Sequence, residues 1–221
     1  MIEFDSSYNK FLSPPVPVEE HRLPVLVSVR LHALKTFDPI TASYQTKFTV
    51  SLKWKDSRLE YNNLRALPNT NRMEPAEREK IWFPYFIFDN TNKKIENIID
   101  AQSTLKVIRN GSGQLSEPEH TENKFVYLGR ENYIEYERFY SEQFECDYFL
   151  HWYPFDYQTC YIDIKPSSGV ADFIKLVPDE FEYDGPLDLT EYNVKKTEIR
   201  IENDTMLRVE VGVEKVWTQL R

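Results

Sequence analysis

Two cysteines, Cys146 and Cys160, carry the most definite chemistry in this sequence, because a pair of thiols can stay reduced or close a disulfide. They are the only cysteines among 221 residues. By count alone, so few cysteines favour a reduced pair in a cytosolic protein. Two Asn-X-Ser/Thr sequons, at Asn110 and Asn203, lie in polar turn-like stretches and favour secretion, with both asparagines glycosylated. Both redox states stay open at this point.

Other arrangements with chemical potential are absent from the sequence. There is no Gly-rich phosphate loop, no Gly-X-Ser-X-Gly elbow and no His-Glu-X-X-His pair. The four histidines are scattered without metal-ligand spacing. Carboxylate pairs occur throughout a chain of net charge -9, and nothing marks any of them as a glycosidase dyad. These observations argue against an enzyme, and the acidic balance argues against a nucleic-acid partner, which would need clustered Lys and Arg.

Alternating apolar and polar residues are the main structural signal. From Leu23 to Ala33 every odd position is apolar, and from Tyr44 to Trp54 the even positions carry the bulky side chains. A period of two over such lengths predicts long strands with one face in a core, and the turn Phe37-Asp38-Pro39 joins them as a hairpin. Leu207–Glu214 alternates in the same way, and Tyr133–Phe144 is expected to be an aromatic-rich strand.

Helices are expected to be few. Glu74–Lys80 predicts one or two turns and Ser6–Leu12 a short N-terminal helix. Many strands with turn signals between them predict an all-β fold, an immunoglobulin-like twisted β-sandwich with a short N-terminal helix, as one domain over residues 1–221. No stretch approaches the ~20 apolar residues of a membrane span, and Met1–Asp5 lacks the features of a signal peptide. The chain is therefore expected to be either cytosolic or a processed or truncated piece.

The segment between the cysteines is the most specific motif. Thirteen residues separate them, and the segment ends in Tyr153-Pro154-Phe155-Asp156-Tyr157-Gln158-Thr159-Cys160. This resembles the signature loop of Cys-loop receptors, the pentameric ligand-gated ion channels, in which a disulfide closes Cys-X13-Cys around Phe-Pro-Phe-Asp-X-Gln-X-Cys. Tyr153 replaces the first Phe, and Phe149 stands where the family usually has Asp. The resemblance implies a Cys146–Cys160 disulfide, which would restrict the unfolded chain by about 3 kcal/mol. The alternative is a hairpin with two unrelated cysteines.

Further matches extend the resemblance over most of the chain. Trp54-Lys55-Asp56-Ser57-Arg58-Leu59 is similar to the family's Trp-X-Asp-X-Arg-Leu, and Asp38 falls on the family's Asp in the first hairpin turn. Ile81-Trp82-Phe83-Pro84 followed by Asn90 resembles the Trp-X-Pro segment that leads into binding loop A. Their order and separations cover residues from about Leu23 to Arg221. The resemblance implies the extracellular ligand-binding domain of such a receptor.

In that family agonists bind between subunits, and the matching positions of this chain define a site of unusual composition. On the principal side, the loop A position falls on Asp89, with Ile87 as the alternative, and the loop B position falls on Ser167. On the complementary side, the strand D positions fall on Thr49 and Ser51. The strand E positions fall near Tyr127, Glu135 and Glu137. These residues do not make the aromatic cage that attracts ammonium groups, so acetylcholine is not expected. The resemblance suggests a small cation or divalent metal held by Asp89, Glu135 and Glu137. The alternative is a set of solvated carboxylates without a physiological ligand.

A second acidic cluster lies at the position of loop F. Asp179, Glu180 and Glu182 begin it, and a hard cation such as Ca²⁺ takes several carboxylate oxygens. Calcium modulation through these three residues is one interpretation, and a solvated charged loop is the other. No other cofactor is expected.

The resemblance also implies an assembly and a mechanism. Five identical or related subunits would form a ring on the extracellular side of the plasma membrane. Tyr153, Pro154 and Phe155 would contact the protein's own transmembrane domain, and Asp38, Asp156 and Arg221 would help to couple ligand binding to the pore. Two alternatives stay open: a soluble secreted protein like the acetylcholine-binding proteins, which have no pore, and an unrelated secreted adhesion sandwich.

Overall fold

The computed structural model describes residues 2–4, 8–10, 14–17, 21–67, 69–91, 93–115, 125–152, 155–202 and 205–216. In chain order its elements are β1 (Ile2–Glu3), β2 (Leu23–Asp38), β3 (Ser43–Trp54), β4 (Glu60–Asn62), α1 (Pro75–Arg78), β5 (Phe86–Phe88), β6 (Ile95–Glu96), β7 (Ser103–Ile108), β8 (Gln114–Leu115), β9 (Phe125–Leu128), β10 (Tyr133–Glu145), β11 (Tyr157–Pro166), β12 (Ile174–Tyr183), β13 (Tyr192–Glu202) and β14 (Met206–Lys215). The all-β prediction is confirmed.

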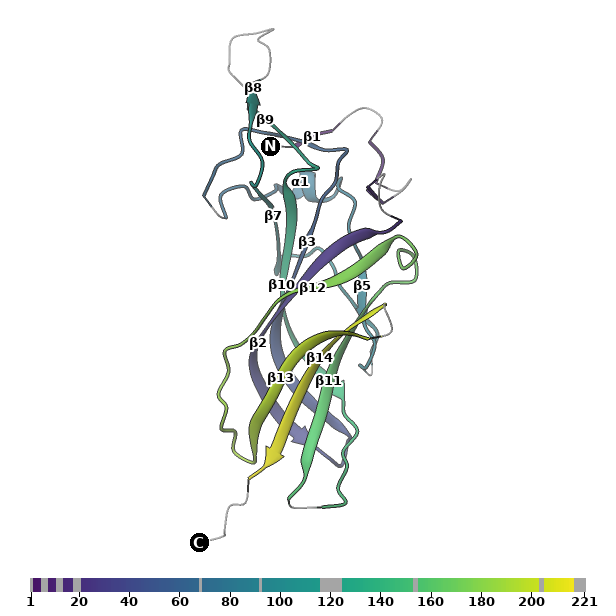
Figure 1. The fold of residues 1–221 in the computed structure, drawn as a ribbon, viewed down its shortest axis with the longest axis vertical. Helices are drawn as coiled ribbons and strands as arrows, with labels where there is room; N and C mark the ends of the chain where they lie inside the picture. Colours follow the sequence, from purple (N-terminus) through teal and green to yellow (C-terminus); the bar gives the residue numbers. More distant parts are fainter. Residues whose placement is uncertain are drawn as a thin grey trace.

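The strands form three sheets (Figure 1). A small sheet has the order β1-β4-β9-β8 and lies near the N-terminus, and two larger sheets have the orders β12-β2-β3-β10-β7 and β13-β14-β11-β5-β6. Within the described residues every strand pair is antiparallel except β2 with β12, which is parallel. The two larger sheets pack as a sandwich, and β14 ends at the end of the molecule opposite β1.

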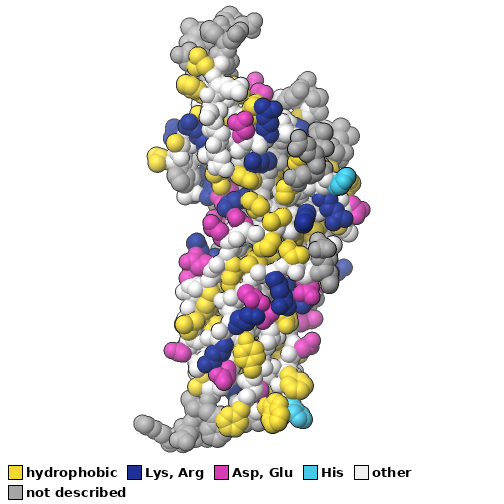
Figure 2. Space-filling model, viewed as in Figure 1, with side chains coloured by type: hydrophobic (Ala, Val, Ile, Leu, Met, Phe, Trp, Pro, Cys, Tyr) yellow, Lys and Arg dark blue, Asp and Glu magenta, His cyan; other side chains and the backbone are white. Residues whose placement is uncertain are grey.

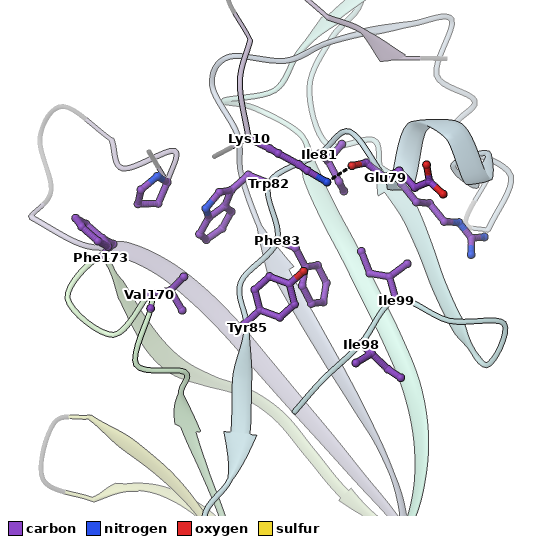
Figure 3. A pocket seen from close by; sticks show the side chains of 13 residues that line it. Lys10, Glu79, Ile81, Trp82, Phe83, Tyr85, Ile98, Ile99, Val170 and Phe173 are labelled. Atoms are coloured by element: carbon purple, nitrogen blue, oxygen red, sulfur yellow. Dashed lines mark hydrogen bonds between the residues drawn. The ribbon is translucent and has the colours of Figure 1, made fainter. Parts of the chain in front are cut away.

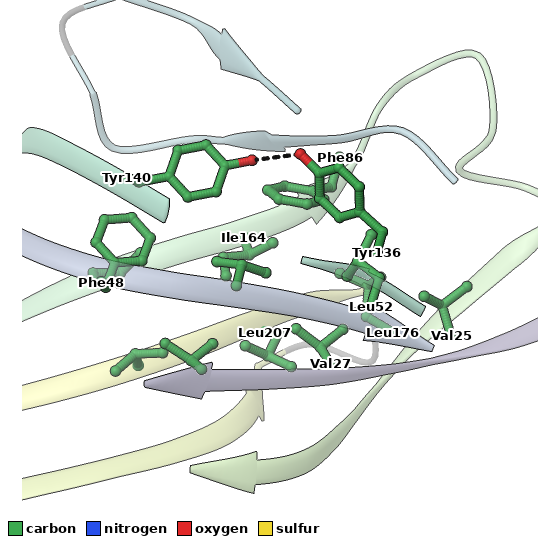
Figure 4. Packing of buried hydrophobic residues seen from close by; sticks show 14 of the residues in the cluster. Val25, Val27, Phe48, Leu52, Phe86, Tyr136, Tyr140, Ile164, Leu176 and Leu207 are labelled. Atoms are coloured by element: carbon green, nitrogen blue, oxygen red, sulfur yellow. Dashed lines mark hydrogen bonds between the residues drawn. The ribbon is translucent and has the colours of Figure 1, made fainter. Parts of the chain in front are cut away.

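Aromatic and aliphatic side chains together fill the space between the two larger sheets (Figure 4). Phe48 of β3 meets Phe88 of β5 edge to face with ring centroids 5.4 Å apart, and Tyr140 of β10 stacks on Phe48 at the same separation. Such contacts add to the free energy gained by removing apolar surface from water. The hydroxyl groups of two of the core tyrosines are satisfied, because the Tyr136 hydroxyl donates to the Ile98 carbonyl at 2.9 Å and lies 3.2 Å from the Tyr140 hydroxyl.

The β2–β3 hairpin follows the predicted alternation at first and then departs from it. Odd residues of β2 are buried from Leu23 to Leu31, but Leu34 is buried next instead of Ala33. The cause is a shift of register between Leu31 and Ala33, and a second shift lies between Lys35 and Phe37. Each extra residue moves the following side chains to the other face, so the predicted inward position of Ala33 was wrong.

The one described helix begins where the sequence predicted it. Pro75 occupies its first turn, and the Glu77 carboxylate accepts the backbone N–H of Glu74 at 2.8 Å. The other oxygen of Glu77 accepts the Ile2 N–H at 2.8 Å, which ties β1 to the helix. The predicted helix over Ser6–Leu12 falls mainly outside the described residues, which include only 8–10 of that range.

The Trp-X-Asp-X-Arg-Leu motif is a buried charge clamp at the end of β3. Asp56 is fully buried, and the Arg58 guanidinium donates to its two oxygens at 2.8 and 2.7 Å. The Tyr8 hydroxyl donates to the same carboxylate at 3.3 Å. The pKa of Tyr8 is raised to about 12, mainly because the hydroxyl is buried and secondly because the Asp56 carboxylate is negatively charged. This motif therefore holds the N-terminal segment against the sandwich.

Candidate functional site

The two cysteines form a disulfide that closes the segment between β10 and β11. Their Cα atoms are 5.0 Å apart and both residues are buried. The loop lies at the end of the molecule where strand β14 ends (Figure 1). Tyr153 and Pro154, at the tip of the motif, lie outside the described residues.

The side chain of Gln158 fixes the shape of this loop from inside. Its amide accepts the Phe149 N–H at 2.8 Å and donates to the Phe149 carbonyl at 3.0 Å. The same amide donates to Asp156, and both Asp156 and Gln158 are buried. The Asp-X-Gln part of the motif is therefore an internal brace, and it leaves the apolar residues of the loop on the outside.

Large apolar side chains are exposed along the outer part of the loop. Trp152 is 70% exposed and Phe155 is 75% exposed, with Phe149 and Leu150 beside them in sequence. Hydrophobic side chains gather at this end in the space-filling view (Figure 2). Clusters of exposed apolar side chains are, in general, common at surfaces that contact another protein or a membrane.

Two other segments meet the disulfide loop at this end. The β2–β3 turn is linked to the disulfide loop because the Cys146 N–H donates to the Ala42 carbonyl at 2.9 Å. The end of β14 is linked to the loop because the Lys215 N–H donates to the backbone carbonyl of Asp156 at 3.3 Å. Asp38 shapes the turn itself, because it accepts the Thr41 hydroxyl at 2.8 Å and the Ile40 N–H at 2.9 Å. These hydrogen bonds lower the pKa of Asp38, and the one from the Thr41 hydroxyl has the largest effect. The structure thus brings the disulfide loop, the Asp38 turn and the last strand together, while Arg221 lies outside the described residues.

A polar groove of about 300 Å³ crosses the outer face of the β12-β2-β3-β10 strands. We call it the acidic groove, and it is lined by Ser28, Val29, Arg30, His32, Thr49, Ser51, Lys53, Glu135, Glu137, Glu180 and Glu182. Outward-facing residues of neighbouring strands meet there because period two puts alternate side chains on one face. The groove therefore brings together Thr49, Ser51, Glu135 and Glu137, which were predicted for the complementary side, with two residues of the predicted calcium cluster.

Negative charge exceeds positive charge in the acidic groove. Its four carboxylates face the two permanent cations Arg30 and Lys53. Glu135 is largely buried and pairs with Lys106 at 2.6 Å, and Ser51 donates to it at 3.3 Å. Among the described residues Glu137 has no ion-pair partner, so at least one carboxylate is left for a ligand.

The three residues of the predicted calcium cluster lie on strand β12, whereas the sequence placed them in a loop. Asp179 pairs with Lys53 at 3.0 Å and accepts the Ser28 hydroxyl at 3.1 Å, and Glu182 pairs with Arg30 at 2.8 Å. No group of three or more His, Cys, Asp or Glu side chains in the described part of the chain is arranged to hold a metal ion. A calcium ion bound here would need further ligands from outside one chain.

The predicted principal-side residues lie together on the other large sheet. Ile87 of β5 pairs with Lys165 of β11, and the Ser167 N–H donates to the Tyr85 carbonyl at 2.9 Å. Asp89 forms an ion pair with Lys165 at 2.6 Å. Since Glu135 belongs to β10 of the opposite sheet and to a separate ion pair, one chain does not bring Asp89 and Glu135 together.

Loop A is held in place by a network around Asn90. The Asn90 side chain accepts the Asp163 N–H at 2.9 Å and donates to the Tyr161 carbonyl at 2.8 Å. Asp163 is buried and receives two hydrogen bonds from Arg208 at 2.7 and 2.9 Å, and the guanidinium of Arg208 lies over the Tyr161 ring. The segment after β5 is thus anchored across β11 to β14.

Three other predicted site residues have different surroundings. Tyr127 is buried in the small sheet, where it pairs with Tyr61 and lies under the Arg109 guanidinium, so it does not line the acidic groove. Asn110 is exposed in the loop after β7, and Asn203 lies outside the described residues.

Sequence reasoning missed Arg30, Lys53 and His32 as groove residues. The signal was present, because Arg30 and His32 alternate with the buried residues of β2 and Lys53 with those of β3. What the sequence does not show is the parallel pairing of β12 with β2, which places Glu182 opposite Arg30.

A second hollow of about 670 Å³ lies near the N-terminal segment (Figure 3). Its walls are mostly apolar, with Trp82, Phe83 and Tyr85 on one side and Val170 and Phe173 facing them. Tyr85 and Phe173 are exposed. No predicted site residue lines it.

A β-sandwich that carries a disulfide-braced apolar loop at one end and a charged groove on one sheet defines a ligand-binding domain of the Cys-loop class. The family model described as neurotransmitter-gated ion-channel ligand binding domain matches residues 2–218, and the chain belongs to that family. It is a family of channel domains rather than of enzymes.

One curated relative is the proton-gated ion channel of Gloeobacter violaceus (strain ATCC 29082 / PCC 7421), which is 31% identical over 90 residues. The match covers 41% of this chain and 23% of that protein, so the chain matches only about a quarter of the relative's length. No described helix of the present chain has the length and apolar character to cross a membrane.

Proposed function

We propose that this chain is the ligand-binding domain of a pentameric ligand-gated ion channel that binds a small cation between subunits and acts on a pore through the Cys146–Cys160 loop. The observation that carries the proposal is the acidic groove. Positions that the family resemblance assigns to strand D, strand E and loop F line one hollow with excess negative charge. Carboxylate and hydroxyl oxygens are ligands for hard cations.

The other half of the site would come from the neighbouring subunit of a ring of five identical or related chains. Ile87, Asp89 and Ser167 lie near one another on the opposite sheet, and Asp89 would add a carboxylate to the groove of its neighbour. In a closed ring every interface joins two different faces of the same chain. This geometry supplies the further ligands that one chain lacks for a divalent cation such as Ca²⁺.

The braced loop supports the coupling part of the proposal. Trp152 and Phe155 are exposed beside the Asp38 turn and the end of β14, so three segments at this end can move against one apolar partner. A transmembrane domain of the same protein is a partner of that kind. The second oxygen of buried Asp156 has no hydrogen-bond partner among the described residues, and a cation supplied at this junction would satisfy it.

The domain would accordingly lie on the extracellular side of the plasma membrane. The rival reading is a soluble secreted binding protein without a pore, which predicts the same groove but a disulfide loop without a function in gating. Replacing Phe155 by Ala in the full-length protein distinguishes the channel from the soluble binding protein. In a channel, this variant should lose ligand-evoked current and keep ligand binding, whereas a soluble binding protein has no current to lose.

The cation class is tested by calorimetric titration of the chain with CaCl₂ and, separately, tetramethylammonium chloride. Glu137→Gln and Glu180→Gln each remove one groove carboxylate and should weaken binding about tenfold. Glu60→Gln changes an exposed carboxylate of β4 and should leave binding unchanged. Equal affinities in all variants contradict the site, and native mass spectrometry of the same samples should show five copies.

A further inference from the structure

His32 occupies a special position in strand β2. The register of β2 against β3 pairs Leu31 with Phe48 and Ala33 with Lys47, so His32 is the extra residue between two paired ones. A bulge of this kind re-aims one side chain without ending the strand. Here it directs the imidazole over the acidic groove, where it is about one-third exposed.

Both ring nitrogens of His32 have partners in different segments. Nδ1 lies 3.2 Å from an oxygen of Asp184, directly after β12, and Nε2 lies 2.8 Å from the Thr49 hydroxyl on β3. The ring also stacks on Phe139 of β10, with centroids 5.9 Å apart. From β2, the imidazole thus contacts β3, β10 and the residue that follows β12.

The partners determine where the proton of the neutral imidazole resides. An ionised carboxylate only accepts, so Nδ1–H donates to Asp184, and Nε2 then accepts the hydroxyl proton of Thr49. When the ring is protonated, both nitrogens donate. Thr49 must then accept from Nε2–H, and its own proton is free to turn toward the groove.

We propose that His32 is a proton switch for the acidic groove, whose protonation reverses the hydrogen bond to Thr49 and adds one positive charge among the groove residues. This inference rests on the proposed function for its consequence, namely that acid weakens cation binding. The switch itself depends only on contacts within one chain. Neutral His32 leaves the groove with its negative excess, and charged His32 offsets part of it.

Charged groups face His32 from each strand around it. They are Arg30 on β2, Lys53 on β3, Glu135 and Glu137 on β10, and Glu180, Glu182 and Asp184 on or directly after β12. Carboxylates outnumber cations, and Asp184 is in direct contact. These groups also titrate in acid, so the test must separate His32 from them.

Methyl NMR of threonine-labelled chain, recorded with the His32 ring protons during a pH titration, provides that separation. The Thr49 methyl signal should show an inflection at the same midpoint as His32, and His32→Gln should remove it. Asp184→Asn removes the carboxylate at Nδ1, and in this variant the Thr49 methyl signal should still follow the midpoint of His32. A Thr49 signal that does not follow His32, or an inflection that survives in His32→Gln, overturns the proposal. If His32→Gln does not fold, the wild type and Asp184→Asn still decide it.

Calcium titrations at about pH 7.5 and about pH 5.5 test the consequence. The affinity of wild type should fall about fivefold more than that of His32→Gln, the effect expected for one charge near a divalent ion in a water-like dielectric. An equal fall in both proteins overturns the regulation by His32. Absence of calcium binding at both pH values contradicts the cationic site of the proposed function, and the NMR experiment then decides the switch alone.

Discussion

The Gln158 side chain and the Phe149 backbone hydrogen-bond in both directions across the disulfide loop. Phe149 donates to Gln158 at 2.8 Å and accepts from it at 3.0 Å, so one side chain acts as the neighbouring strand would. The disulfide closes the loop at its base and this pair closes it further along. The exposed aromatic side chains Trp152 and Phe155 therefore lie on a loop that is closed at two places.

Replacing Gln158 by Glu tests this brace. A carboxylate keeps the size of the amide but cannot donate to the Phe149 carbonyl, and it lies against the carboxylate of Asp156. We expect the free energy of unfolding to fall by about 1–3 kcal/mol, the cost of leaving a buried polar group unpaired. Urea unfolding measures it. Gln102→Glu, on an exposed turn, is the control, and equal midpoints for Gln158→Glu and wild type would contradict the brace.

The Asp56–Arg58 clamp predicts a second large effect. Arg58→Ala leaves a fully buried carboxylate without its cation, which costs about 3–5 kcal/mol in comparable sites. Arg130 is the matched control, because its pair with Glu131 is exposed and 4.0 Å long and should contribute less than about 1 kcal/mol. Thermal unfolding followed by circular dichroism compares the variants. A similar loss of stability in the Arg58 and Arg130 variants would show that the buried Asp56–Arg58 pair contributes no more to stability than an exposed pair.

Gly129 predicts a steric effect beside the same clamp. A Cβ atom there would lie 2.7 Å from the Leu59 carbonyl oxygen and closer still to that of Asp56, both of them backbone atoms that cannot move aside independently. Gly129→Ala should therefore destabilise the chain by about 1–3 kcal/mol, as overpacking does. A Cβ atom on Gly169 would meet nothing within 4 Å, so Gly169→Ala should unfold at nearly the wild-type urea concentration. If both alanine variants unfold at that concentration, the close packing at Gly129 is not rigid.

The sequence predicted those parts of the fold that local patterns determine. Long alternating runs became β2, β3, β10 and β14, and the cysteine spacing became a disulfide. The alternation did not reveal the bulge at His32, since a bulge inserts a residue without any special type there. It also did not reveal that β12 runs parallel to β2, because such a pairing depends on contacts between distant segments.

The same limit applies to the candidate site. Thr49, Ser51, Glu135 and Glu137 were identified through the resemblance, but their neighbours Arg30 and His32 were not identified as site residues. Whether a carboxylate is free or already paired depends on three-dimensional neighbours, as Lys106 shows for Glu135 and Lys165 for Asp89. Sequence reasoning therefore predicted the residue types of the groove but not its charge balance.

The Asp100–Arg138 pair predicts a measurable loss of stability in acid. Hydrogen bonds from Arg138, the nearest 2.8 Å long, lower the pKa of Asp100 in the folded protein. A carboxyl group with a lowered folded pKa stabilises the fold above its unfolded value of about 3.9, and that contribution is lost as the pH falls through the folded value. Asp100→Asn removes the charge at every pH. The variant should therefore be less stable than wild type at neutral pH, by at most about 1 kcal/mol for a pair this accessible to solvent.

The difference between Asp100→Asn and wild type should shrink as the pH falls below about 4, because wild type then loses the same charge. Urea unfolding at a series of pH values from neutral to acid measures this difference directly. Asp172→Asn, in an exposed turn before β12, is the control and should differ little from wild type at any pH. The contrary outcome is a difference in the free energy of unfolding between Asp100→Asn and wild type that stays constant as the pH falls. The loss of stability would then arise from the introduced amide, and the ion pair would contribute nothing to the stability of the fold.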